Sequence, residues 1–229
     1  MPKLLAIDTS SESCSVALSI DDDIRERHEH APMRHAELLL PAVQSLLEQA
    51  GLELSGLDAV AFGRGPGSFT SLRIGIGAVQ GMAWAAGLPV VPVSSLAAVA
   101  QAAVTETAWA AGRICVAMDA RMAEVYTGVF QVGPDGLAQA DGEERVCPPE
   151  AVEAVTAEPF MTAGNGFERF ECLQTLAMRA ERSRPDTGPR AAAVCRLARA
   201  WCQENDPLPP AFAQPVYLRN QVAVKPTRG

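Results

Sequence analysis

The sequence lacks an excess of basic residues. Its 229 residues include 19 Lys and Arg against 27 Asp and Glu, which gives a formal net charge of −8. Proteins that bind nucleic acid by themselves usually present a basic face, because much of the affinity comes from neutralising phosphates. We therefore expect any contact of this chain with nucleic acid to run through a partner protein. At 48% hydrophobic and 20% charged residues, the composition is that of a chain with a packed core.

The sequence also lacks the usual spacings of metal ligands. None of its six cysteines forms a Cys-x-x-Cys pair, and the three histidines, His28, His30 and His35, include no pair at i and i+4. Zinc sites usually depend on such spacings. We expect no metal site, and we expect the cysteines to be free thiols of a reducing compartment.

Long hydrophobic runs are missing as well. The apolar run near the N-terminus is short, and the small-residue stretch over residues 74–91 is interrupted by Gln80, by glycines and by Pro89. A signal peptide or a membrane span needs a longer uninterrupted run. We expect a cytoplasmic protein that does not contact a membrane.

A glycine-rich stretch, GRGPGSFTSLRIGIG, occupies residues 63–77. It lacks the Gly-Lys pair of a Walker A loop, the G-x-G-x-x-G spacing of a dinucleotide fold and the G-x-S-x-G turn of many hydrolases. Arg64 and Arg73 leave anion binding open as one interpretation. The favoured interpretation is architectural: a tight turn leads into a helix whose small residues let another helix approach closely. These small residues are Gly77, Ala78, Gly81 and Ala85.

The same order of strands and helices occurs twice along the chain. The first copy is predicted as strands over residues 3–10, 14–20 and 21–31, a helix over 35–51, a strand over 57–63, a helix over 70–86, a strand over 87–93 and a helix from Ser94. Pro41 is expected in or near the first turn of its helix, because a later proline would kink it. The plan recurs more loosely after Thr107, with a helix near residues 148–155.

This repetition predicts an α/β protein of two lobes. We place the first lobe at residues 1–106 and the second at 107–212. A C-terminal segment, residues 213–229, is expected to pack back on the first lobe.

Two aspartates end predicted strands, Asp8 in AIDTS and Asp119 in AMDAR, one in each lobe. The carboxyl ends of strands are where α/β proteins gather their functional sites. The alternative is that each aspartate caps the turn that follows it, and the sequence leaves both interpretations open. The candidate residues near an anion or nucleotide are Asp8, Thr9, Arg64, Arg73, Asp119 and Arg121.

Several blocks together resemble the TsaB family, also called YeaZ. They are LLAIDTSSESCSVAL, RHAELLLPAV, FGRGPGSFTSLRIGIGAVQGMAWAAGLPVVPVSSL, AMDARMAEVY and PVYLRN. The resemblance is close over most of the first half of the chain and scattered over the second. It implies an actin-like, sugar kinase-like α/β fold of two lobes, each a mixed sheet with helices.

The resemblance also implies a role in making threonylcarbamoyladenosine next to the anticodon of tRNAs that read ANN codons. In that family the paralogue TsaD is catalytic, TsaE is an ATPase partner, and TsaB is a non-catalytic subunit. The implied partners are TsaD and TsaE, or a second copy of the chain when TsaD is absent, with tRNA reached through the complex.

The sequence departs from catalytic relatives at two places. The histidine positions of the TsaD metal motif fall on Ser95 and Val99, and neither side chain is a good metal ligand. The Asp-x-Gly turn that wraps phosphate in actin-like ATPases is missing its glycine after Asp8 and after Asp119. We therefore expect no catalytic residue and no tightly bound cofactor, with ATP or ADP only at a subunit interface.

The partner surface is expected on the helices over residues 35–51 and 70–86. Its predicted members are His35, Leu38, Leu39, Ala42, Val43, Leu46, Leu72, Ile74, Gly77, Ala78, Gly81 and Ala85. The alternative hypothesis is an enzyme in its own right, either a metallopeptidase-like protein or a small-molecule kinase of the same fold.

Overall fold

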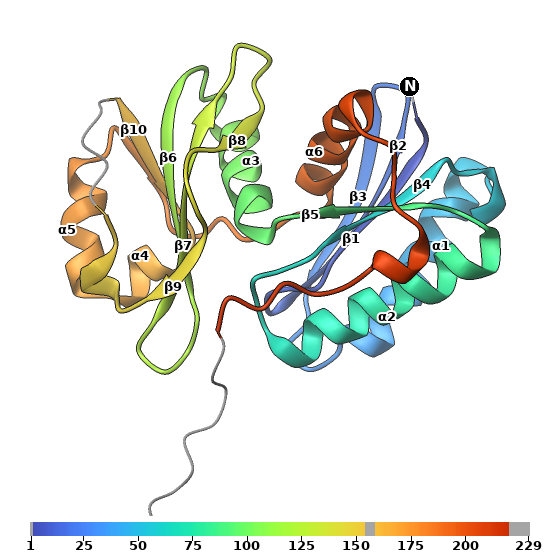
Figure 1. Ribbon diagram of the computed structural model, residues 1–229, viewed down its shortest axis with the longest axis horizontal. Helices are drawn as coiled ribbons and strands as arrows, with labels where there is room; N and C mark the ends of the chain where they lie inside the picture. The colour runs from blue at the N-terminus through green and yellow to red at the C-terminus, as the bar shows by residue number, and fades with distance from the viewer. Residues whose placement is uncertain (1, 154–158, 220–229) are drawn as a thin grey trace, which may run out of the picture.

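The computed structural model describes residues 2–153 and 159–219 and contains two mixed sheets side by side (Figure 1). In the first sheet the strand order is β3-β2-β1-β4-β5. Strands β1 to β3 are antiparallel, whereas β4 and β5 run parallel to β1. The bounds are β1 (Leu4–Asp8), β2 (Ser13–Ile20), β3 (Asp23–His30), β4 (Ala59–Gly63) and β5 (Val90–Val93).

The second sheet repeats this pattern of pairings. Its order is β11-β10-β6-β7-β8, with β9 also paired to β7. The β6–β7–β8 part is antiparallel and the β6–β10–β11 part is parallel, so β6 corresponds to β1. The bounds are β6 (Gly112–Asp119), β7 (Val125–Val132), β8 (Ala138–Ala140), β9 (Arg145–Cys147), β10 (Phe160–Ala163) and β11 (Arg182–Arg184). The predicted two-lobed α/β fold with a repeated plan is confirmed.

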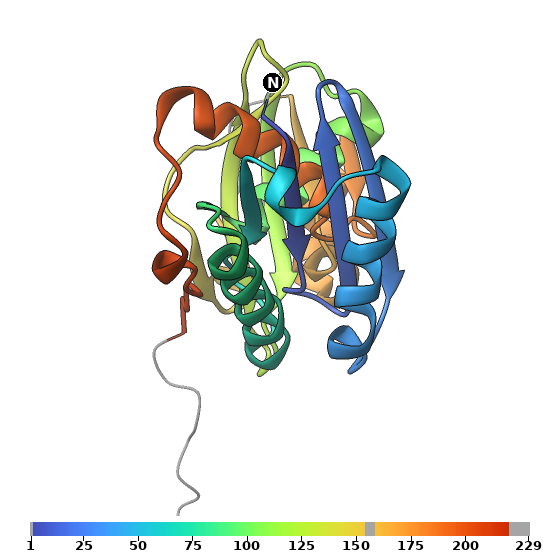
Figure 2. The ribbon, with the colours of Figure 1, turned by 90° about the vertical axis from the view of Figure 1, so that its right-hand side faces the viewer.

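Two helices, α1 (His35–Ala50) and α2 (Phe69–Ala86), cover one face of the first sheet (Figure 2). They bury Leu39, Val43 and Leu46 from α1 and Leu72 and Val79 from α2 in one core with the strands. Helix α1 ends where Gly51 takes the left-handed conformation, which a residue without Cβ adopts at little cost.

Pro41 differs from its predicted place. It lies in the second turn of α1, since the helix begins at His35. Its ring is exposed, and it leaves the carbonyl of Glu37 without the usual helical donor. The helix continues because its buried stripe packs on the sheet, and tertiary packing outweighs one missing hydrogen bond.

The helices α3 (Ser95–Thr107) and α6 (Ala191–Glu204) are exchanged between the lobes. Helix α3 follows the first sheet in sequence but packs most of its buried apolar side chains in the core of the second, whereas Ala98 and Ala102 belong to the core that contains α6. Helix α6 follows the second sheet but packs on β1, β2 and β4 of the first. The two helices contact each other between the sheets (Figure 1). The predicted lobe boundaries therefore differ from the packing at both helices.

The second lobe is completed by two short helices, α4 (Gly166–Arg169) and α5 (Glu171–Arg179). Short 3₁₀ turns occur at η1 (Leu54–Gly56), η2 (Pro149–Ala151) and η3 (Pro210–Phe212). The helix predicted near residues 148–155 is this η2 turn over its described part, and its last two residues lie outside the described ranges.

After α6 the chain runs back along the first lobe, and we call residues 207–219 the strap. Leu208 bridges to Val90 at the edge of β5, and Ala213 is buried in the core of the first lobe. The backbone N–H of Val216 donates to the carbonyl of Arg64. These contacts lie on the first lobe. The return of the whole segment 213–229 stays a prediction, and residues 220–229 lie outside the described part.

Candidate functional site: the strand ends and the outer face of α2

Asp8 ends β1 and is buried, with only 1% of its surface exposed. Its Oδ1 accepts hydrogen bonds from the backbone N–H and the hydroxyl of Ser10, at 2.8 and 2.7 Å. Its Oδ2 accepts the hydroxyl of Ser95 at 3.1 Å. Burial raises the pKa of the Asp8 carboxyl above its usual value, although these hydrogen bonds oppose the rise. Both carboxylate oxygens are thus occupied by groups of the chain itself.

The glycine-rich stretch encloses the turn after β1. A Cβ at Gly63 would lie 1.8 Å from Oδ2 of Asp8, and a Cβ at Gly75 would lie 2.2 Å from Oγ1 of Thr9. Thr9 donates to the carbonyl of Ser71 at 2.7 Å. These glycines therefore make room for the chain's own β1–β2 turn.

Asp119 ends β6 as Asp8 ends β1, but its surroundings are different. Its Oδ1 accepts a hydrogen bond from the backbone N–H of Arg121 at 2.9 Å. Asp119 therefore caps the turn that follows it, which is one of the two interpretations that the sequence leaves open. Its Oδ2 lies 3.5 Å from the Arg121 guanidinium and 3.4 Å from that of Arg169. Arg121 also reaches across to Glu12 of the first lobe, at 2.8 Å. The carboxylate therefore organises a contact between the lobes.

The candidate anion-binding residues are not brought together in one site. Arg73 lies on the outer side of α2, where its Nε donates to the hydroxyl of Tyr217 at 3.1 Å. Arg64 follows β4 and is held through its backbone by Val93 and Val216. Burial raises the pKa of Glu144 above its usual value, and the hydrogen bond from Ser94 and the charge of Arg64 oppose the rise. Glu144 accepts a hydrogen bond from Ser94, the N-cap of α3.

The sequence did not point to the Ser94–Glu144 bond or to the Arg73–Tyr217 bond. The partners are 50 and 144 residues apart along the chain, and no local pattern connects them. The sequence does predict Ser94 as the N-cap of α3, because Ser94 stands directly before an apolar helical stretch.

The predicted partner surface divides into a buried and an accessible part. Five of its residues lie inside the first lobe and are covered by the chain itself, with at most 5% exposure: His35, Leu39, Val43, Leu46 and Leu72. His35 also has its Nε2 3.0 Å from the carbonyl oxygen of Ser11. The other seven remain accessible: Leu38, Ala42, Ile74 and Ala78 are half-buried, and Gly77, Gly81 and Ala85 are exposed.

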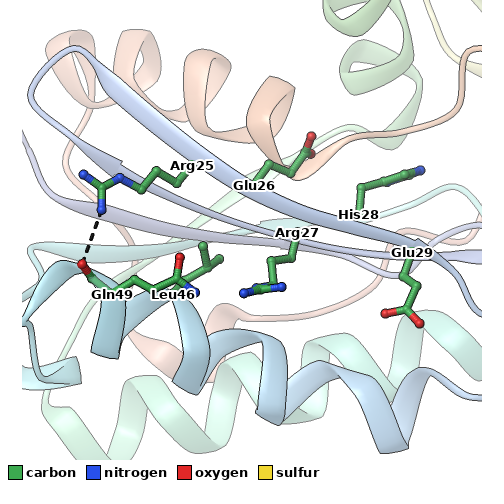
Figure 3. A pocket seen from close by; sticks show the side chains of 7 residues that line it. All are labelled: Arg25, Glu26, Arg27, His28, Glu29, Leu46 and Gln49. Atoms are coloured by element: carbon green, nitrogen blue, oxygen red, sulfur yellow. Dashed lines mark hydrogen bonds between the residues drawn. The ribbon is translucent and has the colours of Figure 1, made fainter.

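An open groove runs between the edge strand β3 and α1 (Figure 3). Arg25, Arg27 and Glu29 alternate along β3 with Glu26 and His28, and Leu46 and Gln49 come from α1. Arg25 donates to the carbonyl of Gln49 at 3.4 Å. The mixture of positive and negative side chains along β3 fits an edge strand that is protected against pairing with a strand of another chain.

Within the described residues no three His, Cys, Asp or Glu side chains gather in a way that could hold a metal ion. Over the same ranges, none of the helices is long and apolar enough to cross a membrane.

The two sheets with the same pattern of strand pairings define an α/β protein of two lobes. A family model described as TsaD, tRNA N6-adenosine threonylcarbamoyltransferase, matches residues 28–176. The chain is 38% identical to the tRNA threonylcarbamoyladenosine biosynthesis protein TsaB of Escherichia coli, covering 99% of each chain. It is 36% identical to the TsaB protein of Haemophilus influenzae, covering 99% of this chain and 97% of that one.

Solved structures agree with these relatives. YeaZ from Pseudomonas aeruginosa superposes with a TM-score of 0.87 at 42% identity, covering 95% of this chain and all of that one. The chain belongs to the TsaB (YeaZ) family.

Proposed function

We propose that this chain is the non-catalytic subunit of an assembly that transfers a threonylcarbamoyl group to adenosine in tRNA. The proposed partners are the catalytic paralogue TsaD and the ATPase TsaE. The names of the TsaB relatives support the pathway. The internal bonding of Asp8 supports the non-catalytic role, because its carboxylate oxygens are already hydrogen-bonded to Ser10 and Ser95.

The observation that carries the proposal is the bare outer face of α2. A Cβ added at Gly77 or at Gly81 would meet nothing within 4 Å, and Ala85 continues this exposed stripe. Half-buried Ile74 and Ala78 border it on the same helix. Small residues at this spacing let a second helix approach to backbone distance. The partner surface proposed is this stripe with Leu38 and Ala42 of α1.

The remaining parts of the proposal concern ligands and location. A second copy of the chain takes the same surface when TsaD is absent. ATP or ADP binds at a subunit interface and not tightly within this chain. Contact with tRNA is made through the complex, since a net charge of −8 disfavours direct binding. The assembly works in the cytoplasm.

The pairing is tested by Gly81→Leu, which places a bulky side chain on the bare stripe. We expect the affinity for purified TsaD to fall by a factor of about 10 or more, because the helices can no longer approach. Gly188→Leu is the matched control, because a Cβ at Gly188 also meets nothing within 4 Å and the residue lies beyond α2 in the second lobe. Unchanged binding by Gly81→Leu in calorimetry would contradict the pairing surface.

The non-catalytic role is tested in a reconstituted modification assay with TsaD, TsaE and tRNA. We expect the assay to require this chain and to tolerate Asp8→Asn in a folded variant. Turnover of ATP or of a peptide by the purified chain alone, lost in Asp8→Asn, would instead support the enzyme hypothesis.

A further inference from the structure

Large exposed side chains gather along the boundary between α2 and the strap. Of the eight large hydrophobic side chains exposed in the described ranges, four belong to α2 or to the strap: Phe69, Trp84, Phe212 and Tyr217. Figure 2 shows α2 between α1 and the strap, so this boundary lies on the side of α2 away from α1. It is adjacent to the glycine stripe but contains the large side chains that the stripe lacks. Aromatic residues and arginine are the types most enriched at the centres of protein interfaces.

Arg73 is the centre of this group. Its guanidinium carbon lies 3.7 Å from the centroid of the Phe69 ring, and its Nε donates to the Tyr217 hydroxyl. The two rings are 5.1 Å apart. We call Phe69, Arg73 and Tyr217 the aromatic–arginine cluster. The two terminal nitrogens of Arg73 have no hydrogen-bond partner and no carboxylate partner among the described residues.

The strap holds the cluster in place from both ends. On one side Gln80 of α2 donates to the carbonyl of Pro210, at 3.4 Å. On the other side Arg219 donates to the carbonyl of Ala120 at 3.0 Å and pairs with Glu124, both in the β6–β7 turn of the second lobe. Tyr217 stands between these anchors, so the cluster is ordered before any partner arrives. A preordered surface loses less conformational entropy on binding.

The charge around the aromatic–arginine cluster indicates which kind of chemical group it would bind. Helix α2 contains no Asp or Glu, and Arg73 is its single charged residue. On a chain with a net charge of −8, such a face is an exception. A guanidinium that is stacked on a ring and keeps free donors is suited to a carboxylate.

We propose that the aromatic–arginine cluster is a second part of the docking surface, and that it receives an acidic side chain on an apolar segment of the partner protein. The inference rests on the proposed function, since the partner is the same TsaD paralogue. The strap is then a component of the interface, although it lies more than 100 residues from α2 in sequence.

The test compares the affinities of full-length variants for purified TsaD by calorimetry at low and high salt. Arg73→Ala is expected to weaken binding by a factor of about 10 to 100, and Tyr217→Ala by a similar factor. The wild-type affinity should fall as salt rises, and the Arg73→Ala affinity should change less, because a charge pair at an accessible site is screened. Arg179→Ala is the matched control, since Arg179 is an exposed arginine on α5 of the other lobe.

The Arg219→Ala variant tests whether the strap contributes to binding by holding Tyr217 in place, because Arg219 itself is not expected to contact the partner. Its side chain is mostly buried against the second lobe, so its loss should weaken binding by releasing Tyr217. Thermal melts of each variant show whether the fold is kept, and Arg73→Lys keeps the charge while losing the planar stacking, so it should bind between wild type and Arg73→Ala.

The outcomes distinguish this inference from the proposed function. If Gly81→Leu abolishes pairing while Arg73→Ala and Tyr217→Ala bind as wild type, the cluster is not part of the interface and the inference is overturned. If Gly81→Leu also binds as wild type, the proposed pairing surface fails as well. If Arg73→Ala lowers binding of tRNA to the complex while pairing is unchanged, the occupant is a nucleic acid and the inference is again overturned.

Discussion

A buried carboxylate such as Asp8 makes stability depend on pH in a defined direction. Burial raises its pKa in the folded chain above the ordinary value of 3.8. Above that pH the unfolded chain loses the proton first, so the folded chain binds more protons. The free energy of unfolding contributed by Asp8 therefore falls as the pH rises from the ordinary value through the raised folded value.

Asp8→Asn is expected to remove this dependence. The variant gains stability relative to wild type as the pH rises from about 4, and the difference becomes constant once Asp8 is ionised in both states. Urea unfolding of both proteins over a pH series measures the difference. A difference that does not change with pH would show that the Asp8 carboxyl titrates normally.

Among single residues, the sequence was most informative about those that stand at the end of a predicted strand. Asp8 and Asp119 were found because each ends a buried strand. Their different roles were not readable, since they depend on Ser95 and Arg169, which lie 87 and 50 residues away. The departures at Ser95 and Val99 were visible because the resemblance to the family fixes their alignment.

Helix α2 shows how three glycines on one helix have different roles. Gly75 faces Thr9 at a distance that leaves no room for a methyl group, whereas Gly77 and Gly81 face open space. The sequence prediction treated the last two as the close-packed pair. Within the chain the close approach is made by Gly75, and the other two remain free for a partner.

Gly75→Ala and Gly77→Ala are therefore expected to change stability in opposite directions. Gly75→Ala should lower the free energy of unfolding by about 1–3 kcal/mol, because the added methyl group overpacks the contact with Thr9. Gly77→Ala should raise it by up to about 1 kcal/mol, because alanine favours the helix. Urea denaturation measures both, and equal effects would contradict the packing described.

Helix α1 shows what the spacing of apolar residues cannot predict. Its apolar spacing predicted a helix over residues 35–51, and α1 spans His35–Ala50. Periodicity alone could not say whether Leu39 and Val43 face the chain's own sheet or a partner. That choice depends on where β2 and β3 lie, and the structure places the stripe against the sheet.

At the scale of the whole molecule, α6 is attached to the first sheet by a charged group of the edge strand. Glu26 of β3 accepts hydrogen bonds from Arg190, from the backbone N–H of Ala192 and from Ser15. Burial would raise the pKa of Glu26, but these hydrogen bonds and the Arg190 charge more than offset it and leave the pKa below its ordinary 4.5. Glu26 thus stabilises the fold above that pH.

Glu26→Gln is expected to cost about 2 kcal/mol of unfolding free energy at neutral pH, because charge-assisted hydrogen bonds are lost. The cost should shrink as the pH falls below about 4.5, where wild-type Glu26 takes up a proton on unfolding. Thermal or urea unfolding of both proteins between acid and neutral pH measures this. Glu204→Gln, at an exposed position at the end of α6, is a control expected to change little.

The sequence predicted the two lobes from the repeated order of elements, yet it could not predict the exchange of α3 and α6. Both helices carry small apolar residues on more than one side. Either sheet could therefore accept either helix, and the partner is decided by the geometry of the connections.

This exchange has a consequence for synthesis on the ribosome. The first sheet is translated early, but α6 and the strap that cover it come from the last fifth of the chain. The second lobe, with α3, forms one continuous stretch and has all its residues available sooner. Domains generally fold as units while the chain emerges, and contacts distant in sequence form late. The second lobe is thus expected to fold first, with the face of the first sheet that α6 covers left open to chaperones until translation ends.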